Sequence, residues 1–196
     1  MKKAIRTVAA FSIVFALLIT GCKNNAVSEK PANEALTTEQ LIKKGEYLVS
    51  IMGCNDCHSP KEMGQNGPSL IEGLILSGYP AERPLKKVAK NVIDEGWVLM
   101  NSDNTAAAGP WGVSFAANIT SDQTGIGNWT EENFKRALKE GKYKGLENSR
   151  MLLPPMPWQN YNVISDDDIK AVYSFLLSTK AVSNLVPAAI NAEDIK

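Results

Sequence analysis

The stretch Gly53–His58, with the sequence GCNDCH, places two thiols three positions apart and a histidine directly after the second thiol. Cys54 and Cys57 are the two thiols, and His58 is the only histidine among the 196 residues. The only other cysteine is Cys22. This clustering of rare and chemically active side chains predicts that the chain is organised around this stretch.

The spacing C-x-x-C-H is typical of covalent attachment of a c-type haem. Each thiol can bond to one of the two vinyl groups of a porphyrin, and the adjacent histidine then lies under the iron. The sequence therefore predicts one haem c, with Cys54 and Cys57 as covalent attachment sites and His58 as an axial ligand. A structural or redox-active dithiol is the alternative, although no βαβ unit is indicated around it. A closed zinc site needs four ligands, and no second Cys/His pair supplies them.

The first residues have the parts of an export signal. Three basic residues precede an apolar run at residues 8–19, and small residues follow before Cys22. The apolar run is too short to span a bilayer comfortably. Residues 18–22 resemble the lipobox of bacterial lipoproteins, which implies cleavage before Cys22 and lipid attachment to its sulfur. The alternative is an ordinary signal peptide that ends in an unpaired cysteine. Either reading predicts an exported domain, and the lipobox predicts an anchor to a bacterial membrane, facing the periplasm or the cell exterior.

Composition divides the chain into four parts. We expect a signal peptide at residues 1–21, a lipid-anchored flexible tether at 22–35, one haem domain at 36–186 and a C-terminal tail at 187–196. The tether is polar, and its coil dimension would be about 20 Å. Cleavage would leave a formal charge of −3, because three of the 21 basic residues are lost against 21 acidic residues. This charge does not favour a nucleic-acid partner.

Three helices are predicted from their start signals, which are N-cap residues combined with capping-box or hydrophobic-staple partners. The N-caps are Thr37, Thr130 and Ser165. The first helix leads directly into Cys54, and the second ends at Gly141, which suits a left-handed C-cap. Three aspartates at 166–168 open the last helix, where carboxylates stabilise the positive end of the helix dipole. A calcium site at these aspartates is the alternative.

Residues 109–120 and 124–130 together resemble the monohaem units of the cytochrome c subunits that serve membrane-bound alcohol and aldehyde dehydrogenases. The likeness to class I c-type cytochromes covers roughly residues 36–186. It implies an all-α fold, a cytochrome c-like helical shell around one covalently bound haem, with long loops and room for a short hairpin insertion. The first and last helices of this family cross near a glycine and an aromatic residue, and Gly45 and Tyr173 would be that pair.

The same resemblance implies surroundings for the haem. Gly67–Leu70 resembles the segment whose proline carbonyl, here that of Pro68, accepts the proton on the other nitrogen of the ligand histidine. Asn118 and Trp129 would line the haem edge. The alternatives are an ordinary turn at Pro68 and a core-filling role for the tryptophan.

The sixth iron position is predicted to be Met156. It lies between prolines in residues 153–158 (LPPMPW), just before the last helix, where class I cytochromes place their ligand. Flanking prolines restrict the backbone and hold the sulfur with little entropy left to lose. Met151 and an open or non-methionine site are the alternatives, and Met100 lies outside the matching segment.

These features predict a one-electron carrier rather than an enzyme. With His58 and Met156 on the iron, it would shuttle electrons between periplasmic or membrane redox partners, such as a dehydrogenase, an oxidase or another cytochrome. The membrane would be reached through lipid on Cys22. Two alternatives are a small peroxidase-like haem enzyme with an open distal site and a haem-based gas sensor. The enzyme alternative is weakened because the sequence has no second histidine to act as a distal acid or base.

Overall fold

The computed structural model describes residues 35–195. The predicted signal peptide, Cys22 and the tether up to residue 34 lie outside these residues and stay predictions. Residues from Leu36 onward cluster as one unit. Within the described part of the chain, no helix combines the length and the apolar character needed to cross a membrane.

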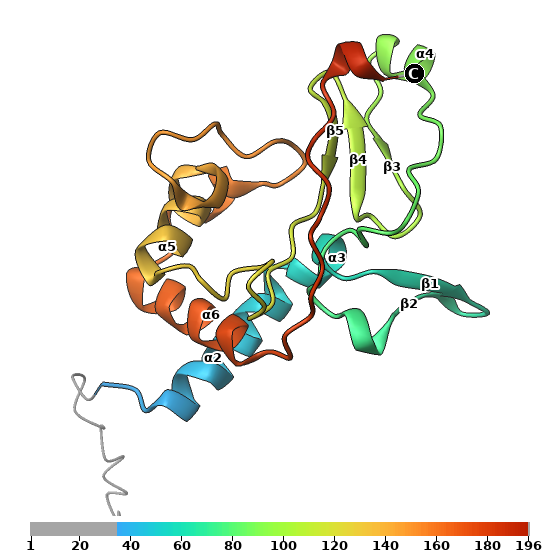
Figure 1. The fold of residues 1–196 in the computed structure, drawn as a ribbon. Helices are drawn as coiled ribbons and strands as arrows, with labels where there is room; N and C mark the ends of the chain where they lie inside the picture. Colours follow the sequence, from blue (N-terminus) through green and yellow to red (C-terminus); the bar gives the residue numbers. More distant parts are fainter. Residues whose placement is uncertain (1–34, 196) are drawn as a thin grey trace, which may run out of the picture. The chain divides into compact units, whose positions relative to one another are not determined.

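Five α-helices form in this unit, and the caps explain where the longer ones begin (Figure 1). Their bounds are α2 (Thr38–Ile51), α3 (Cys54–His58), α4 (Lys90–Asp94), α5 (Glu131–Glu140) and α6 (Asp166–Ser178). Short 3-10 helices are η2 (Glu72–Leu74), η3 (Tyr143–Gly145), η4 (Trp158–Tyr161) and η5 (Ala192–Asp194). The predicted N-caps Thr37, Thr130 and Ser165 each accept a hydrogen bond from a backbone N–H three residues later. Gly141 ends α5 with φ of 68°. The three predicted helix starts are confirmed.

The helices α2 and α6 cross at Gly45, as the sequence predicts. A Cβ built on this buried glycine would lie 2.0 Å from the backbone oxygen of Ala171 and 2.6 Å from Cβ of Phe175. The predicted aromatic partner is wrong. Tyr173 points to another neighbour, where its ring lies 5.6 Å from that of Phe134. Because Phe175 lies two residues further along α6, it faces a different side of the helix and meets Gly45 instead.

The prediction of an all-α fold is wrong, because the unit also contains two antiparallel sheets. One is a hairpin of β1 (Lys61–Gly64) and β2 (Gly67–Leu70), and the other has the order β3 (Leu99–Met100), β4 (Ala106–Gly109), β5 (Gly112–Phe115). Each hairpin turn has two residues and is followed by a glycine with positive φ, 106° at Gly67 and 103° at Gly112. Such glycines are typical of tight hairpins.

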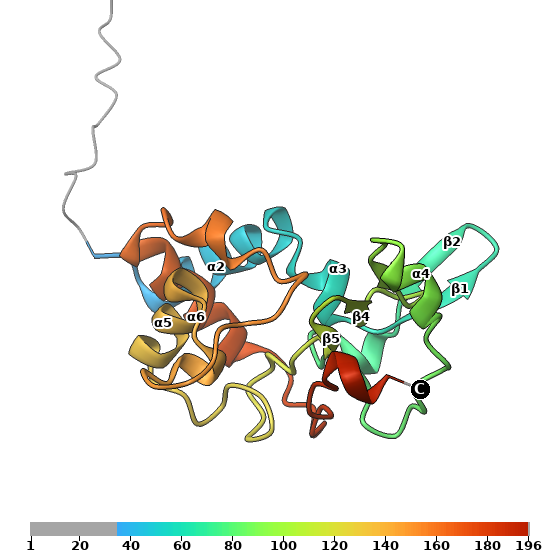
Figure 2. The ribbon, with the colours of Figure 1, turned by 90° about the horizontal axis from the view of Figure 1, so that it is seen from above.

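Two apolar clusters hold the unit together. The larger joins α2, α5, α6 and the loops between them, and its buried members are Val49, Leu76, Ile126, Phe134, Leu138, Ile169, Val172 and Leu176. The smaller contains Ile93, Ala108 and Val113, with Ile190 and Ile195 packed against it. The backbones of Val113 and Ile190 exchange hydrogen bonds of 2.8 and 2.9 Å, so residues near the C-terminus lie against β5. Both views show α3 between the long helices and the three-stranded sheet (Figures 1 and 2).

Candidate functional site

The helix α3 presents the two thiols and the histidine of the sequence motif. It starts after Gly53, whose φ of 69° turns the chain sharply out of α2. A left-handed residue at this point favours glycine. Cys54 and Cys57 are three positions apart, so their side chains share one face of the helix. Both cysteines are free and half-buried. The local fold therefore offers two thiols to one ligand, with His58 in the next position.

The ring of His58 is fixed by one hydrogen bond. Its Nδ1 lies 2.7 Å from the carbonyl oxygen of Ala117. A carbonyl oxygen can only accept, so Nδ1 carries the proton and Nε2 keeps its lone pair. Burial lowers the pKa of His58, and the hydrogen bond to Ala117 only partly opposes this effect. The imidazole is therefore neutral near neutral pH, which is the form that binds a metal ion through Nε2.

The partner of this ring is not the residue that the sequence predicts. Pro68 lies in β2, where it is exposed and pairs with Met63. The hairpin leads Pro68 away from α3, while the residues after β5 return toward it. Backbone bonds from Gly78 to His58 and from Tyr79 to Ala116 join the two segments. The predicted acceptor for the His58 ring, the carbonyl of Pro68, is therefore wrong. The acceptor is the carbonyl of Ala117. A backbone acceptor leaves no signature in the side-chain sequence, so this residue could not be found by motif.

Both thiols of the site are protonated at neutral pH. Burial raises the pKa of Cys54 to about 11, with smaller contributions from Asp56 and Cys57. Burial also raises the pKa of Cys57, which the nearby Lys61 only partly offsets. Redox-active dithiols instead have a thiolate stabilised by a lowered pKa. The electrostatics therefore do not favour the dithiol alternative.

The ammonium group of Lys61 caps the C-terminal end of α3. Its Nζ lies between 2.7 and 3.3 Å from four backbone carbonyl oxygens, those of Asn55, Asp56, Ser59 and Asp103. The last carbonyls of a helix have no partner within the helix, and a cation there also interacts favourably with the helix dipole. Lys61 therefore ties the motif helix to the loop that contains Asp103. Sequence reasoning missed this residue.

Replacement of Lys61 by methionine is expected to destabilise the protein by about 2 to 3 kcal/mol, since hydrogen bonds to a charged group contribute roughly 1.5–3 kcal/mol and the carbonyls lose their partner. Chemical denaturation of Lys61→Met measures this loss. Lys87→Met, at an exposed lysine, is the matched control and should change stability by less than about 0.5 kcal/mol. Equal effects of the two substitutions would show that the cap contributes nothing.

The loop that Lys61 contacts contains an acidic residue, Asp103. It is buried, its carboxylate lies 2.7 Å from Nη1 of Arg83, and it accepts two hydrogen bonds from Thr105. Burial alone would raise the pKa of Asp103, but the hydrogen bonds from Thr105 and Arg83 outweigh it and the net shift is downward. A carboxyl with a lowered pKa stabilises the fold above its ordinary pKa, because the unfolded chain binds the proton more tightly.

Stability is therefore expected to fall as the pH drops below 3.8, the ordinary value for this carboxyl, toward the lowered value in the folded state. The free energy of unfolding of Asp103→Asn, which cannot ionise, should be clearly below wild type near neutral pH and approach it in this acid range. Denaturation of both proteins across the pH range measures the difference. A gap that does not shrink with acid would contradict the assigned ionisation.

Met156 is half-buried, and it packs against the same apolar cluster as Cys54 and Trp129. The two other candidate methionines lie further out, with 41% of Met151 and 43% of Met100 exposed. The hydroxyl of Tyr173 donates to the carbonyl oxygen of Trp129 at 2.6 Å, which fixes the start of α5. The structure thus brings together Cys54, Met156 and Trp129 around one cluster.

Asn118 has a clear structural role. Its side-chain oxygen accepts two hydrogen bonds from Thr120, and its amide donates to Thr124 and to the carbonyl of Val182. It thereby ties the loop after β5 to the chain that follows α6. The segment that holds His58 through Ala117 is therefore itself pinned at the next residue.

Two of the three first-turn aspartates of α6 have charged or hydrogen-bonding partners in the protein. Asp166 pairs with Lys135 and Lys139, and Asp168 pairs with Lys44 while it bonds to the N-cap Ser165. Across residues 35–195, no cluster of three or more His, Cys, Asp or Glu side chains is arranged to hold a metal ion.

Curated proteins with related sequences carry similar names. The chain is 29% identical over 84% of its length to the gluconate 2-dehydrogenase cytochrome c subunit of Pantoea cypripedii, of which this covers 28%. It is 30% identical over 78% of its length to the cytochrome c subunit of the quinone alcohol dehydrogenase of Gluconobacter oxydans (strain 621H), covering 24% of that protein. The chain resembles the cytochrome c subunits of dehydrogenases. A third relative is the fructose dehydrogenase cytochrome subunit of Gluconobacter japonicus. It is 27% identical over 88% of the chain, and the match covers 28% of that relative.

This likeness to cytochrome c agrees with the resemblance that the sequence motifs indicate. No protein-family model matches the chain. The chain spans about a quarter of the length of these relatives.

Proposed function

We propose that this chain is a one-electron carrier with a single haem c, attached through Cys54 and Cys57 and ligated by His58 and Met156. The observation that carries the proposal is the geometry of α3. Two free thiols share one helix face, and the adjacent imidazole keeps Nε2 open because Nδ1 is bonded to Ala117. The cytochrome c names of the relatives support the same function.

The chain's own residues suit this role. When bound, the haem would supply the one-electron couple of its iron. The carbonyl of Ala117 sets the orientation of the His58 ring and increases the basicity of its free nitrogen. Met156 offers a soft, neutral thioether, which favours the reduced state of iron and raises the reduction potential. Cys54 and Met156 are partly buried against the larger apolar cluster, which would limit the access of water to this side of the site.

The partners proposed for the carrier are redox proteins. The matched relatives are named as subunits of gluconate, alcohol and fructose dehydrogenases. By analogy, a dehydrogenase would donate electrons to this chain, and an oxidase or another cytochrome would accept them. We also propose that Cys22 carries a lipid that anchors the exported domain to a membrane.

The proposed function is tested by spectroscopy of the purified protein. A carrier should give a low-spin spectrum in both oxidation states, a single reversible one-electron potentiometric titration and no reaction with hydrogen peroxide. A high-spin spectrum that changes with peroxide would instead indicate the enzyme. Tight, reversible carbon monoxide binding near neutral pH that alters function would indicate the sensor.

A further inference from the structure

Residues 114–117 contact both parts of the chain that carry the candidate iron ligands, His58 and Met156. The carbonyl of Ala117 holds the ring of His58 at 2.7 Å. Three residues earlier, the hydroxyl of Ser114 in β5 donates to the carbonyl oxygen of Pro154 at 2.5 Å. Pro154 lies two residues before Met156. We propose that Ser114 is a positioning residue that holds the Met156 loop in place for sulfur coordination, an inference that rests on the proposed function.

The hydroxyl of Ser114 is oriented by its neighbours. It is buried, and it accepts a hydrogen bond from Nε1 of Trp111 at 3.3 Å. Its single proton can then be donated either to Pro154 at 2.5 Å or to Ala107 at 3.4 Å. The shorter distance favours Pro154. Hydrogen bonds therefore connect the indole of Trp111, through the hydroxyl of Ser114, to the Met156 loop.

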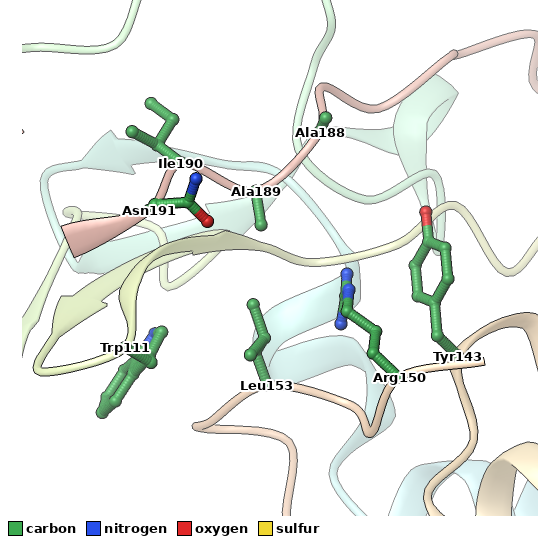
Figure 3. Close-up of a pocket in the computed structure, with 8 residues that line it drawn as sticks. All are labelled: Trp111, Tyr143, Arg150, Leu153, Ala188, Ala189, Ile190 and Asn191. Atoms are coloured by element: carbon green, nitrogen blue, oxygen red, sulfur yellow. The ribbon is translucent and has the colours of Figure 1, made fainter. Parts of the chain in front are cut away.

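The ring of Trp111 is held over the turn between β4 and β5. A Cβ built on Gly109 would lie 2.4 Å from this ring, so the glycine lets the indole approach the backbone closely. Figure 3 shows that Trp111 and Leu153, the residue before Pro154, line one pocket together with Ile190 near the C-terminus. The three-stranded sheet and the Met156 loop therefore lie next to each other at this pocket.

The loop has few other ways to bond. Three prolines at 154, 155 and 157 lack a backbone N–H. Across the described residues, the Ser114 bond is the one hydrogen bond that ties residues 153–157 to a distant element. Without this bond, the nearest backbone hydrogen bonds would be those from Leu152 to Gly141, before the loop, and from Asn160 to Pro157, after Met156. The sulfur would then leave the iron more often, without any change at the attachment helix.

The test compares Ser114→Ala with Ser114→Thr in the haem-loaded protein. Carbon monoxide can bind the reduced iron only when the thioether leaves. Removal of a hydrogen bond that contributes on the order of 1 kcal/mol should increase carbon monoxide affinity about fivefold in Ser114→Ala. The iron–sulfur charge-transfer band of the oxidised protein should weaken as well. Ser114→Thr keeps the hydroxyl and should stay near wild type.

Ser149→Ala is the matched control, because the hydroxyl of Ser149 bonds to Leu146 and Arg150 within its own loop. Unchanged carbon monoxide affinity in Ser114→Ala would overturn the inference and leave the proposed function intact. Equal changes in the Ala and Thr variants would also overturn it, because the effect would then come from packing. A wild-type protein without the iron–sulfur band would overturn both the inference and the assignment of Met156.

Discussion

The substitution Met156→Ala is expected to leave the haem attached but to abolish the iron–sulfur charge-transfer band of the oxidised protein. Alanine has no donor atom, so the sixth position is left to water or to an exogenous ligand. The reduction potential should fall by on the order of a few hundred millivolts, a large part of the roughly 0.8 V range that axial ligands set. Near-infrared absorption and potentiometric titration measure the two effects.

Met151→Ala provides the control for this prediction. Met151 is 41% exposed, lies five residues before Met156 and is the runner-up ligand. Its substitution should leave the band and the potential unchanged. If Met151→Ala abolished the band while Met156→Ala did not, the ligand assignment would pass to Met151. If neither variant changed the spectrum, the sixth ligand would not be one of these two methionines.

A large effect on stability is also expected for Gly45→Ala, at the crossing of α2 and α6. The added Cβ would lie 2.0 Å from the backbone oxygen of Ala171, so the two helices would have to separate. Overpacking costs typically about 1–3 kcal/mol and occasionally more, and a clash with backbone lies at the upper end. Alanine regains about 1 kcal/mol of helix propensity. The net loss should be about 2 kcal/mol or more, measured by chemical denaturation.

Gly73→Ala is the matched control for the helix crossing. Gly73 is exposed, and a Cβ built there meets no atom within 4 Å. This variant should keep wild-type stability within about 0.5 kcal/mol. A Gly45→Ala protein as stable as wild type would show that α2 and α6 do not approach each other as closely as described.

The helices were predictable because their start signals are local. The N-caps are Thr37, Thr130 and Ser165. Each accepts a hydrogen bond from the backbone N–H three residues later, so residues close in the sequence decide where the helix begins. The two sheets were not located from the sequence, which predicted only room for a short hairpin insertion. The residues of β4 are three small alanines and a glycine, all buried, so the strand shows no alternation of apolar and polar side chains. The turn at Gly109–Gly112 was interpreted as part of a haem motif rather than as a hairpin.

The attachment residues of the candidate site were also predictable, because thiols and an imidazole at fixed spacing have few other uses. Their supporting contacts were not. Ala117 acts through its carbonyl, and Lys61 and Ser114 act through bonds to backbone atoms of distant segments. No spacing rule marks such contacts, since they depend on how loops return in three dimensions. The same limit explains why Pro68 and Tyr173 were assigned the wrong neighbours.

The mass of the intact, denatured protein tests the central proposal most directly. We expect the chain to retain one haem after denaturation, and a proteolytic peptide that contains Cys54 and Cys57 to carry it. A variant with both cysteines changed to serine should lose the haem under the same conditions. A wild-type chain that releases its haem on denaturation, or that has the mass of the polypeptide alone, would contradict covalent attachment at this helix.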